Sequence, residues 1–361
     1  MEKNQTIVIA VVAILLVAAV GVGWYVLSGD DEQNQPAEIT DAMGNVVKLD
    51  GVPERIVSTS AVPTEILCDL GFRSNLVGAT SNFGIYDVFS DVYGIDLDFD
   101  YPATIEADMA SGKVANIGKW SWAVEDVLAA NPNLVIMDED QLADINKMKD
   151  IQKVGVDVIV LDADSGFDVI KDNYMMLGKA LGAVDRAEDI CSEIDDALKV
   201  IDNRFDEKAN ASITFAAISY NPGYIYGYGD GGMVQALKSA GYTNAFKTTD
   251  SFFSISYEDI AAANPDVIIF EDMGSMLDWA PIIESWKVDP VMGSIDAIKN
   301  DDFYCLEYGP FRASGYSTVH MVEGYALLPS LMEGAINDSG LPNIVDDKEW
   351  RKNIEWLKEA A

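Results

Sequence analysis

The chain has 361 residues, enough for two domains, and its hydrophobic fraction of 49% supports a large core. Its 60 acidic residues against 24 Lys and Arg give a net charge of −36, a field that repels nucleic acid and excludes it as a partner. A single histidine, His320, argues against a histidine-rich metal site, and any Ser-His-Asp apparatus would have to use it. The cysteines Cys68, Cys191 and Cys305 show no CxxC spacing, so we expect small buried hydrophobes.

The first apolar segment, Ile7–Leu27, carries no charge. At about 1.5 Å per residue it can span a hydrocarbon core about 30 Å thick, and it exceeds the apolar stretch of about 7–15 residues in a cleavable signal. No cysteine lies near its end for lipid attachment. We predict an N-terminal transmembrane helix within residues 1–28 and a polar linker over 29–38. The remainder then faces the extracellular or periplasmic side of the cell membrane. A cleaved signal peptide is the alternative.

Short strands and helices alternate in the next part of the chain. Alternating runs around a turn predict a hairpin over Thr40–Leu49. Strands are predicted over Arg55–Thr59 and Leu76–Thr80, with a helix over Pro63–Gly71 between them. The acidic, aromatic stretch Asn82–Gly112 is predicted to be an irregular insertion or lid-like excursion.

A twelve-residue motif occurs twice, at Glu125–Ile136 and Glu258–Ile269, with seven identical positions. In both copies, acidic residues favour the first turn of a helix, alanines propagate it, and an asparagine before proline ends it. The apolar run that follows predicts a buried strand. A helix–turn–strand unit that occurs twice indicates two similar lobes.

Two helical patterns separate these copies. The first carries Ile170, Tyr174, Leu177 and Leu181 on one face. The second, over Asp185–Lys208, is long enough to connect two lobes. The pattern predicts an α/β fold of two Rossmann-like lobes with mostly parallel sheets, joined by a long rigid helix, with the ligand cleft between them. We expect a first lobe over 39–165, connecting helices over 166–209 and a second lobe over 210–361.

The second lobe is predicted to alternate in the same way. Loop signals at Asn221–Gly223 and Gly227–Gly232 predict a loop around Tyr220, Tyr224, Tyr226 and Tyr228. The expected strands are Ser212–Ile218 and Phe303–Glu307, and the expected helices are Met233–Ala240, Ser314–Glu333 and Lys348–Ala361.

Several of these segments together resemble the extracellular binding proteins of ABC importers for ferric chelates and cobalamin. The resemblance covers about residues 39–335, and its order and spacing are more specific than any one match. The matching segments are Ile39–Asn45, Pro53–Ser58, Thr64–Leu67, Leu76–Gly78 and Leu177–Gly182. This chain departs from the family in its longer 82–112 stretch and in the missing lipid-attachment cysteine.

The resemblance implies a receptor, not an enzyme, that delivers its ligand to a permease and the permease's cytoplasmic ATPase. It implies two lobes joined by a stiff helix, with the ligand between them. It also implies that one exposed glutamate on each lobe docks onto permease arginines, and the motif places these at Glu125 and Glu258. The alternative interpretation is that both are only helix-start acids.

Aromatic residues are the main candidates for the ligand cleft. In the first lobe, Trp120 and Trp122 lie in a predicted loop and suit a flat, partly apolar ligand. In the second lobe, the segment with Tyr224, Tyr226 and Tyr228 and the pair Phe252 and Phe253 offer further aromatic walls, and we select Tyr224, Tyr226 and Phe253 as contact residues. The tryptophans could instead pack in the core, and alternating tyrosines could form a strand with one wet face.

Two polar residues complete the candidate site. Ser60 follows the first strand, in a region where the resemblance implies ligand contact. Arg312 follows the late strand, and its guanidinium suits a carboxylate or phosphate group of a chelate. A structural ion pair is an equal alternative for Arg312 in so acidic a chain.

The resemblance leaves three ligand classes open, namely a ferric siderophore, haem or cobalamin, and we expect no cofactor and no bound metal site. An extracellular hydrolase is the first competing hypothesis, although the sequence contains no G-x-S-x-G, P-loop or G-x-G-x-x-G motif. A surface adhesion module is the second, and it leaves the duplicated glutamate motif without a purpose.

Overall fold

The computed structural model describes residues 36–81, 101–119, 121–138, 145–163, 166–205, 210–248, 250–272, 277–315, 318–337, 339–347 and 350–359. The predicted anchor over residues 1–28 and most of the linker lie outside these ranges. None of the helices within them has the length and apolar character needed to cross a bilayer.

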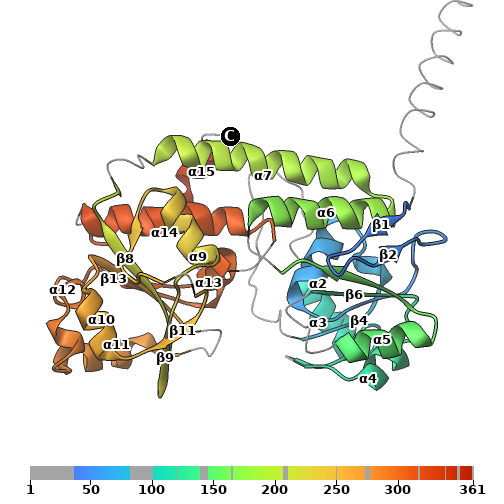
Figure 1. The fold of residues 1–361 in the computed structure, drawn as a ribbon, viewed down its shortest axis with the longest axis horizontal. Helices are drawn as coiled ribbons and strands as arrows, with labels where there is room; N and C mark the ends of the chain where they lie inside the picture. Colours follow the sequence, from blue (N-terminus) through green and yellow to red (C-terminus); the bar gives the residue numbers. More distant parts are fainter. Residues whose placement is uncertain are drawn as a thin grey trace, which may run out of the picture.

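A parallel sheet with strand order β5–β4–β3–β6–β7 forms the first lobe (Figure 1). The predicted hairpin is present as the antiparallel pair β1–β2. The elements of this lobe are β1 (Ile39–Thr40), β2 (Val46–Val47), β3 (Ile56–Ser58), α2 (Ala61–Asp69), η1 (Arg73–Asn75), β4 (Leu76–Ala79), α3 (Tyr101–Ser111), β5 (Ala115–Asn116), α4 (Val124–Ala129), β6 (Leu134–Asp138), α5 (Ile145–Lys153) and β7 (Asp157–Leu161).

Successive side chains of these strands are buried on opposite faces of the sheet. Ile56 and Leu134 pack with residues of α2 in one apolar cluster, whereas Val57 and Val135 pack with residues of α4 and α5 in another. Helices therefore cover both faces. The sequences of these strands are consequently continuous apolar runs, as is typical of buried parallel strands.

The second lobe is built around a larger mixed sheet with strand order β11–β9–β8–β12–β13–β14, and β10 pairs with β8. Strand β9 is antiparallel to both β8 and β11, and the other pairs are parallel. Its elements are β8 (Thr214–Asn221), β9 (Tyr224–Gly227), α9 (Gly232–Ser239), β10 (Thr243–Asn244), β11 (Phe253–Ile255), α10 (Tyr257–Ala263), β12 (Val267–Glu271), α11 (Trp279–Val288), η3 (Met292–Ser294), α12 (Asp296–Lys299), β13 (Phe303–Leu306), α13 (Tyr308–Gly315), α14 (Met321–Ile336), β14 (Ile344–Val345), η4 (Trp350–Ile354) and α15 (Trp356–Glu359).

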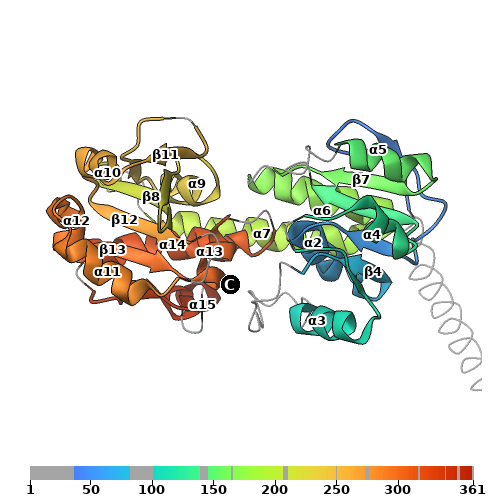
Figure 2. The same cartoon turned by 90° about the horizontal axis from the view of Figure 1, so that it is seen from below.

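Two helices join the lobes, as predicted. Helix α6 (Phe167–Leu181) ends at Gly182, whose φ of 76° is the left-handed conformation that favours glycine. Helix α7 (Val184–Arg204) then runs along both lobes (Figure 1 and Figure 2). Its seam of Ile190, Ile194 and Ile201 is buried in the main core. The two-lobed α/β fold with mostly parallel sheets and a long connecting helix is therefore confirmed.

Three local predictions were wrong. Part of the supposedly irregular 82–112 stretch is helix α3, which buries Ile105 completely and stops before Gly112, a residue with φ of 78°. The helix expected over Ser314–Glu333 is two helices, α13 and α14. The C-terminal helix expected over Lys348–Ala361 is described as a 3₁₀ segment, η4, followed by the short α15.

The tyrosine-rich segment of the second lobe was also predicted as a loop, but residues 224–227 form strand β9. A turn at Pro222 and Gly223, with a φ of 111° at the glycine, connects β9 to β8. The alternative interpretation, an exposed strand with alternating tyrosines, therefore describes this segment. Of the three cysteines, Cys68 and Cys305 are buried and Cys191 is partly exposed.

Candidate functional site

The carboxyl ends of β3 and β6 form a polar edge in the first lobe. Ser60 follows β3, and its hydroxyl donates a hydrogen bond to Asp138 at the end of β6. Beside it, the hydroxyl groups of Ser58 and Thr64 lie 2.6 Å apart. Because β3 and β6 are neighbours in a parallel sheet, their carboxyl ends bring these side chains together. Ser60, a predicted contact residue, is therefore held in a defined orientation.

The structure describes only one of the two tryptophans that we predicted to line the ligand cleft. Trp120 lies outside the described residues. Trp122 is only 5% exposed and packs in the cluster beneath α4 and α5. The Lys147 ammonium lies 4.6 Å from its ring centroid and donates to its backbone carbonyl at 2.8 Å. Trp122 therefore contributes to the core of the first lobe in this structure.

A group of stacked rings occupies the β9–β11 edge of the second lobe. The rings of Tyr226 and Phe252 are stacked with centroids 4.3 Å apart, and Tyr224 and Tyr228 flank them at 5.8 Å and 5.2 Å. Tyr224 and Phe252 are among the exposed large hydrophobic residues. Phe253, which we predicted here, instead packs edge-on against Phe246. We call Tyr224, Tyr226, Tyr228 and Phe252 the aromatic stack.

The sequence had indicated all four residues of the stack as aromatic walls, together with Phe253, and Tyr228 and Phe252 were left out only of the final set of contact residues. Period-two alternation along a strand places Tyr228 on the same face as Tyr224 and Tyr226. The hydroxyl of Tyr228 donates to Glu271 at 2.7 Å, at the carboxyl end of β12. Only the pairing of β9 with β11 brings Phe252 to the same place.

Arg312 lies in helix α13, which begins directly after β13. The start of this helix is anchored by Asp347, which accepts a 2.6 Å hydrogen bond from the backbone N–H of Gly309. Burial, outweighing that hydrogen bond, raises the pKa of Asp347. The structure therefore places the Arg312 backbone near the carboxyl edge of the second sheet. Its side chain is not described, and ligand contact by Arg312 stays a prediction.

The two lobes meet through a group of buried polar side chains, the junction cluster. Its members are Glu65 and Asp69 on α2, Tyr174 on α6, Thr318 and His320 before α14, and Glu323 on α14. Glu65 accepts a 2.5 Å hydrogen bond from Thr318 and lies 3.3 Å from His320 Nε2. Tyr174 donates to Asp69 at 2.6 Å and accepts at 3.4 Å from the backbone N–H of Val319. These contacts link residues more than a hundred positions apart, so they hold the first lobe against the second.

Burial and neighbouring charges shift the titration of this cluster. Burial, assisted by the charge of Glu65, raises the pKa of Asp69 to about 7. Burial would lower the pKa of His320, but Glu65 and Glu323 outweigh it, and the pKa is raised above its usual value. Burial would raise the pKa of Glu323, but the guanidinium of Arg351 and the nearby His320 outweigh it, and the pKa is lowered. Arg351 donates two hydrogen bonds to Glu323, at 2.8 Å and 2.9 Å, an arrangement with strong directionality.

The predicted docking glutamates occupy equivalent positions in the two lobes. Glu125 and Glu258 each lie in the first turn of a short helix, α4 or α10, and both are exposed. Each helix ends at an asparagine with positive φ, 51° at Asn131 and 39° at Asn264, before the proline that precedes the next strand. In Figure 1, α4 and α10 lie on the side of the molecule away from α7, one in each lobe. We call this side the docking face.

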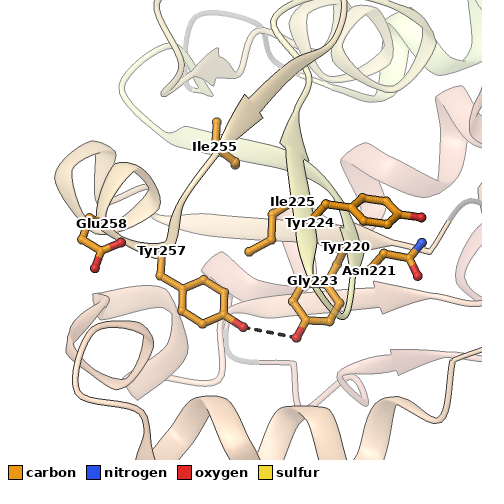
Figure 3. A pocket seen from close by; sticks show the side chains of 8 residues that line it. All are labelled: Tyr220, Asn221, Gly223, Tyr224, Ile225, Ile255, Tyr257 and Glu258. Atoms are coloured by element: carbon orange, nitrogen blue, oxygen red, sulfur yellow. Dashed lines mark hydrogen bonds between the residues drawn. The ribbon is translucent and has the colours of Figure 1, made fainter.

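The two copies differ at their helix starts. Helix α10 begins with a capping box in which Ser256 and Asp259 bond to each other's backbone N–H, whereas Ala123 before α4 makes no side-chain cap. A pocket of about 320 Å³ also adjoins Glu258, between the β8–β9 hairpin and the start of α10 (Figure 3). Its walls include Tyr220 and Tyr257, whose hydroxyl oxygens lie 3.2 Å apart.

The described residues contain no group of three or more His, Cys, Asp or Glu side chains placed to hold a metal ion. The chemistry available at the two sheet edges is instead that of binding. Hydroxyl and carboxylate groups around Ser60 in the first lobe can orient polar groups, and the aromatic stack in the second lobe can contact a flat or conjugated surface.

Comparison with known proteins places this geometry in context. A family model described as "Periplasmic binding protein" matches residues 56–308, which extend from β3 in the first lobe to β13 and the start of α13 in the second. The chain is 26% identical over 295 residues to the uncharacterized ABC transporter substrate-binding lipoprotein YvrC of Bacillus subtilis, covering 81% of this chain and 84% of that protein. It is 21% identical over 281 residues to the Fe(3+)-citrate-binding protein YfmC of the same organism, covering 77% and 80%.

Among solved structures, the petrobactin-binding protein YclQ from Bacillus subtilis has a similar fold. It superposes with a TM-score of 0.63 at 17% identity, over 83% of this chain and 98% of that one. At this level of identity the likeness concerns the fold alone. It covers both lobes and the helix that connects them.

Proposed function

This chain belongs to the periplasmic binding protein family, and on that premise we propose that it is the substrate-binding component of an ABC importer. It captures an iron chelate, haem or cobalamin and delivers it to the permease. The observation that carries the proposal is the match to the family over residues 56–308, which extends across both lobes. The relative described as an ABC transporter substrate-binding lipoprotein supports the same role, since the match covers 84% of that protein. Such a protein binds and releases its ligand without turnover.

The proposed ligand site lies between the carboxyl ends of the two sheets. Ser60, oriented by Asp138, contributes a polar wall from the first lobe. The aromatic stack contributes a flat wall from the second, through Tyr226 and Phe252. Aromatic surface with a few convergent polar groups suits a large conjugated or chelated ligand. An iron chelate agrees with the Fe(3+)-citrate-binding relative. Arg312 is the candidate contact for anionic groups on such a ligand.

Delivery requires that the lobes be recognised by the membrane complex. We assign this role to Glu125 and Glu258, because both are exposed, both begin a repeated helix–strand unit, and both lie on the docking face. Carboxylates pair with arginine through charge-assisted hydrogen bonds. Charged groups at such a surface mainly guide encounter and register.

The proposed location is the outer surface of the cell membrane, where an ABC importer collects its substrate. The YvrC relative is described as a lipoprotein, a class that is held at a membrane by a lipid anchor. In this chain the apolar segment Ile7–Leu27 would supply the anchor instead, as a membrane-spanning helix.

A ligand screen on the full-length chain tests this function. The panel holds ferric citrate, a ferric hydroxamate siderophore, haem, cyanocobalamin and free Fe³⁺, at high ionic strength because the net charge is −36. A bound ligand raises the apparent stability by RT ln(1 + [L]/Kd), so a saturable rise in Tm with one chelate class is expected. A Tm that stays unchanged across the panel, with folded protein, would overturn the proposed ligand classes.

A further inference from the structure

The duplicated helix–strand unit ends in each lobe with a buried acid. Strand β6 ends at Asp138 and strand β12 ends at Glu271, at the same offset from the first glutamate of each copy. Both strands are interior strands of their sheets. Asp138 is 7% exposed and Glu271 is fully buried. Acidic side chains are rarely buried without a partner, so their surroundings at these two strand ends bear on function.

A hydroxyl group donates to the acid in each lobe. Ser60, which follows β3, donates to Asp138, and Tyr228, which follows β9, donates to Glu271 at 2.7 Å. We call these the acid–hydroxyl pairs. In both pairs the acid is buried, whereas the residue that carries the hydroxyl is partly exposed. A hydroxyl has a single proton, so an oxygen that donates to an acid offers only its lone pairs to a further group. Both pairs therefore present hydrogen-bond acceptors.

The acid–hydroxyl pairs lie at edges that face each other. Ser60 is the first residue before helix α2, and helix α13 begins directly after β13, the neighbour of β12. In both views α2 and α13 lie on the inner sides of their lobes (Figure 1 and Figure 2). The carboxyl ends of the two sheets therefore point toward the same region, and in open α/β sheets this is where ligands bind.

A buried hydroxyl without a hydrogen-bond partner accompanies the pair in the second lobe. Ser219 on β8 is directly opposite Glu271 on β12 and Tyr226 on β9, so the three side chains point to one face of the sheet. Ser219 is 1% exposed, and its hydroxyl makes no hydrogen bond within the described part of the chain. Leaving such a group unsatisfied costs free energy, and its position beside the aromatic stack points to a group supplied by a ligand.

We propose that the two acid–hydroxyl pairs make the ligand site selective for a metal chelate that presents N–H or O–H donors and carries no net negative charge. This selectivity rests on the proposed function and narrows its ligand classes. The carboxylates of ferric citrate and the propionate groups of haem would meet lone pairs backed by acids, and like charges placed together disfavour a partner. The amides of a corrinoid and the ammonium of a cationic ferric trihydroxamate share the complementary chemistry.

The test compares ligands that differ only in charge, by isothermal titration calorimetry on the full-length chain at high ionic strength. In the first series, ferrioxamine B carries a free ammonium, its N-acetyl derivative is neutral there, and its N-succinyl derivative carries a carboxylate. In the second series, cyanocobalamin is compared with a monocarboxylate in which an amide is replaced by a carboxylate. In the series that binds, Kd is expected to rise about tenfold or more from the ammonium or amide form to the carboxylate form.

Two amide variants connect this preference to the acid–hydroxyl pairs. Asp138→Asn and Glu271→Gln keep the size of the side chain and an acceptor oxygen but remove the acid. Each is expected to reduce the ratio of the two Kd values by about threefold. Asp150→Asn, which changes an exposed acid on α5, is the matched control and should keep the full ratio. The charge series on the wild type stands even if a buried substitution lowers Tm.

Equal affinities within the series that binds would overturn the proposal. Tighter binding of the carboxylate forms would also overturn it, and would assign selectivity to a cation such as Arg312. An unchanged ratio in both amide variants would show that the preference does not come from Asp138 and Glu271. Binding confined to ferric citrate or haem would overturn the selectivity and leave the receptor function standing. If folded protein binds neither series, ferric citrate nor haem, the proposed ligand classes fall together with the selectivity.

Discussion

At the lobe junction the carboxylates of Glu65 and Glu323 are buried, and each contacts a basic side chain, His320 or Arg351. At the docking face the carboxylates of Glu125 and Glu258 are exposed and contact no basic side chain among the described residues. The protein has 60 acidic residues, so abundance alone says little about any one of them. The comparison shows that the buried acids contribute to holding the lobes together, whereas the exposed Glu125 and Glu258 are accessible to the partner that we propose for them.

The largest expected effect on stability comes from breaking the junction. His320→Ala leaves Glu65 buried beside an apolar side chain, and removing one member of a buried ion pair costs about 3–5 kcal/mol of unfolding free energy. Urea unfolding measures this loss. The control Glu258→Ala changes an exposed residue and is expected to stay within about 0.5 kcal/mol of the wild type. Similar losses in both variants would contradict the contrast between the two regions.

The pH dependence of stability sharpens the same comparison. The pKa of His320 is raised, so its stabilising contribution is present below its unfolded-state value and lost as pH rises through the folded-state value. Asp69 has its pKa raised to about 7 from 3.8, so the folded state favours its protonated form and stability falls as pH rises between those values. Both groups therefore make the protein less stable as pH rises.

Asp69→Asn isolates the contribution of Asp69 to the pH dependence of stability, because the amide mimics a protonated carboxyl. We expect the wild type to lose up to a few kcal/mol relative to the variant between pH 4 and pH 7, measured as urea midpoints at each pH. The exposed Asp150→Asn is the matched control and is expected to follow the wild type. Parallel curves for the wild type and Asp69→Asn would show that Asp69 is ionised in the folded protein.

A smaller effect distinguishes the two copies of the repeated unit. Ser256→Ala removes the capping box of α10 and is expected to cost about 1 kcal/mol. Ala123→Ser offers α4 a cap that it lacks and is expected to raise stability by about 0.5 kcal/mol. Thermal unfolding of the two variants measures both changes. A loss in Ala123→Ser would indicate that the first copy cannot accept a cap in its present backbone geometry.

A small expected change in stability accompanies the largest expected change in transport. Glu125→Lys combined with Glu258→Lys alters two exposed residues, so the unfolding free energy should move by less than about 1 kcal/mol. Uptake of the ligand through the importer should be abolished, because both carboxylates that we propose to dock onto the permease are reversed in charge. Ligand affinity, measured in parallel, should be unchanged. An equal loss of ligand binding would place these glutamates in the ligand site instead.

Much of the fold could be predicted because its signals are local. The repeat ending in Asn131 and Asn264 marks each helix end by the residue before proline, and the apolar runs that follow can satisfy their backbone only as buried strands. Glycine at position 182 and the apolar seam of α7 similarly specify the connecting helices. These patterns depend on neighbours within a few positions, so one sequence suffices to detect them.

The candidate site was predicted less completely, because its members come together only through strand pairing and lobe packing. Phe252 and Phe253 were both indicated, but Phe253 was selected where Phe252 joins the aromatic stack, since the face of each residue depends on the register of β11 with β9. Trp122 was expected in a cleft, but the packing of α4 and α5 buries it. The break between α13 and α14 was missed because it depends on distant contacts, in which Thr318 bonds to Glu65 of the first lobe and Val319 to Tyr174 of α6.

By itself the sequence determined the two α/β lobes, the long helix between them, the duplicated glutamate motif and the family resemblance. Only the tertiary structure decided that the single histidine lies between two glutamates at the lobe junction, and that Tyr220, Ile225 and Ile255 form one row beneath Tyr257. The reason is physical. Helix ends and strand runs follow from local backbone preferences, whereas the charge state of a buried group and the shape of a pocket depend on residues that only folding brings together.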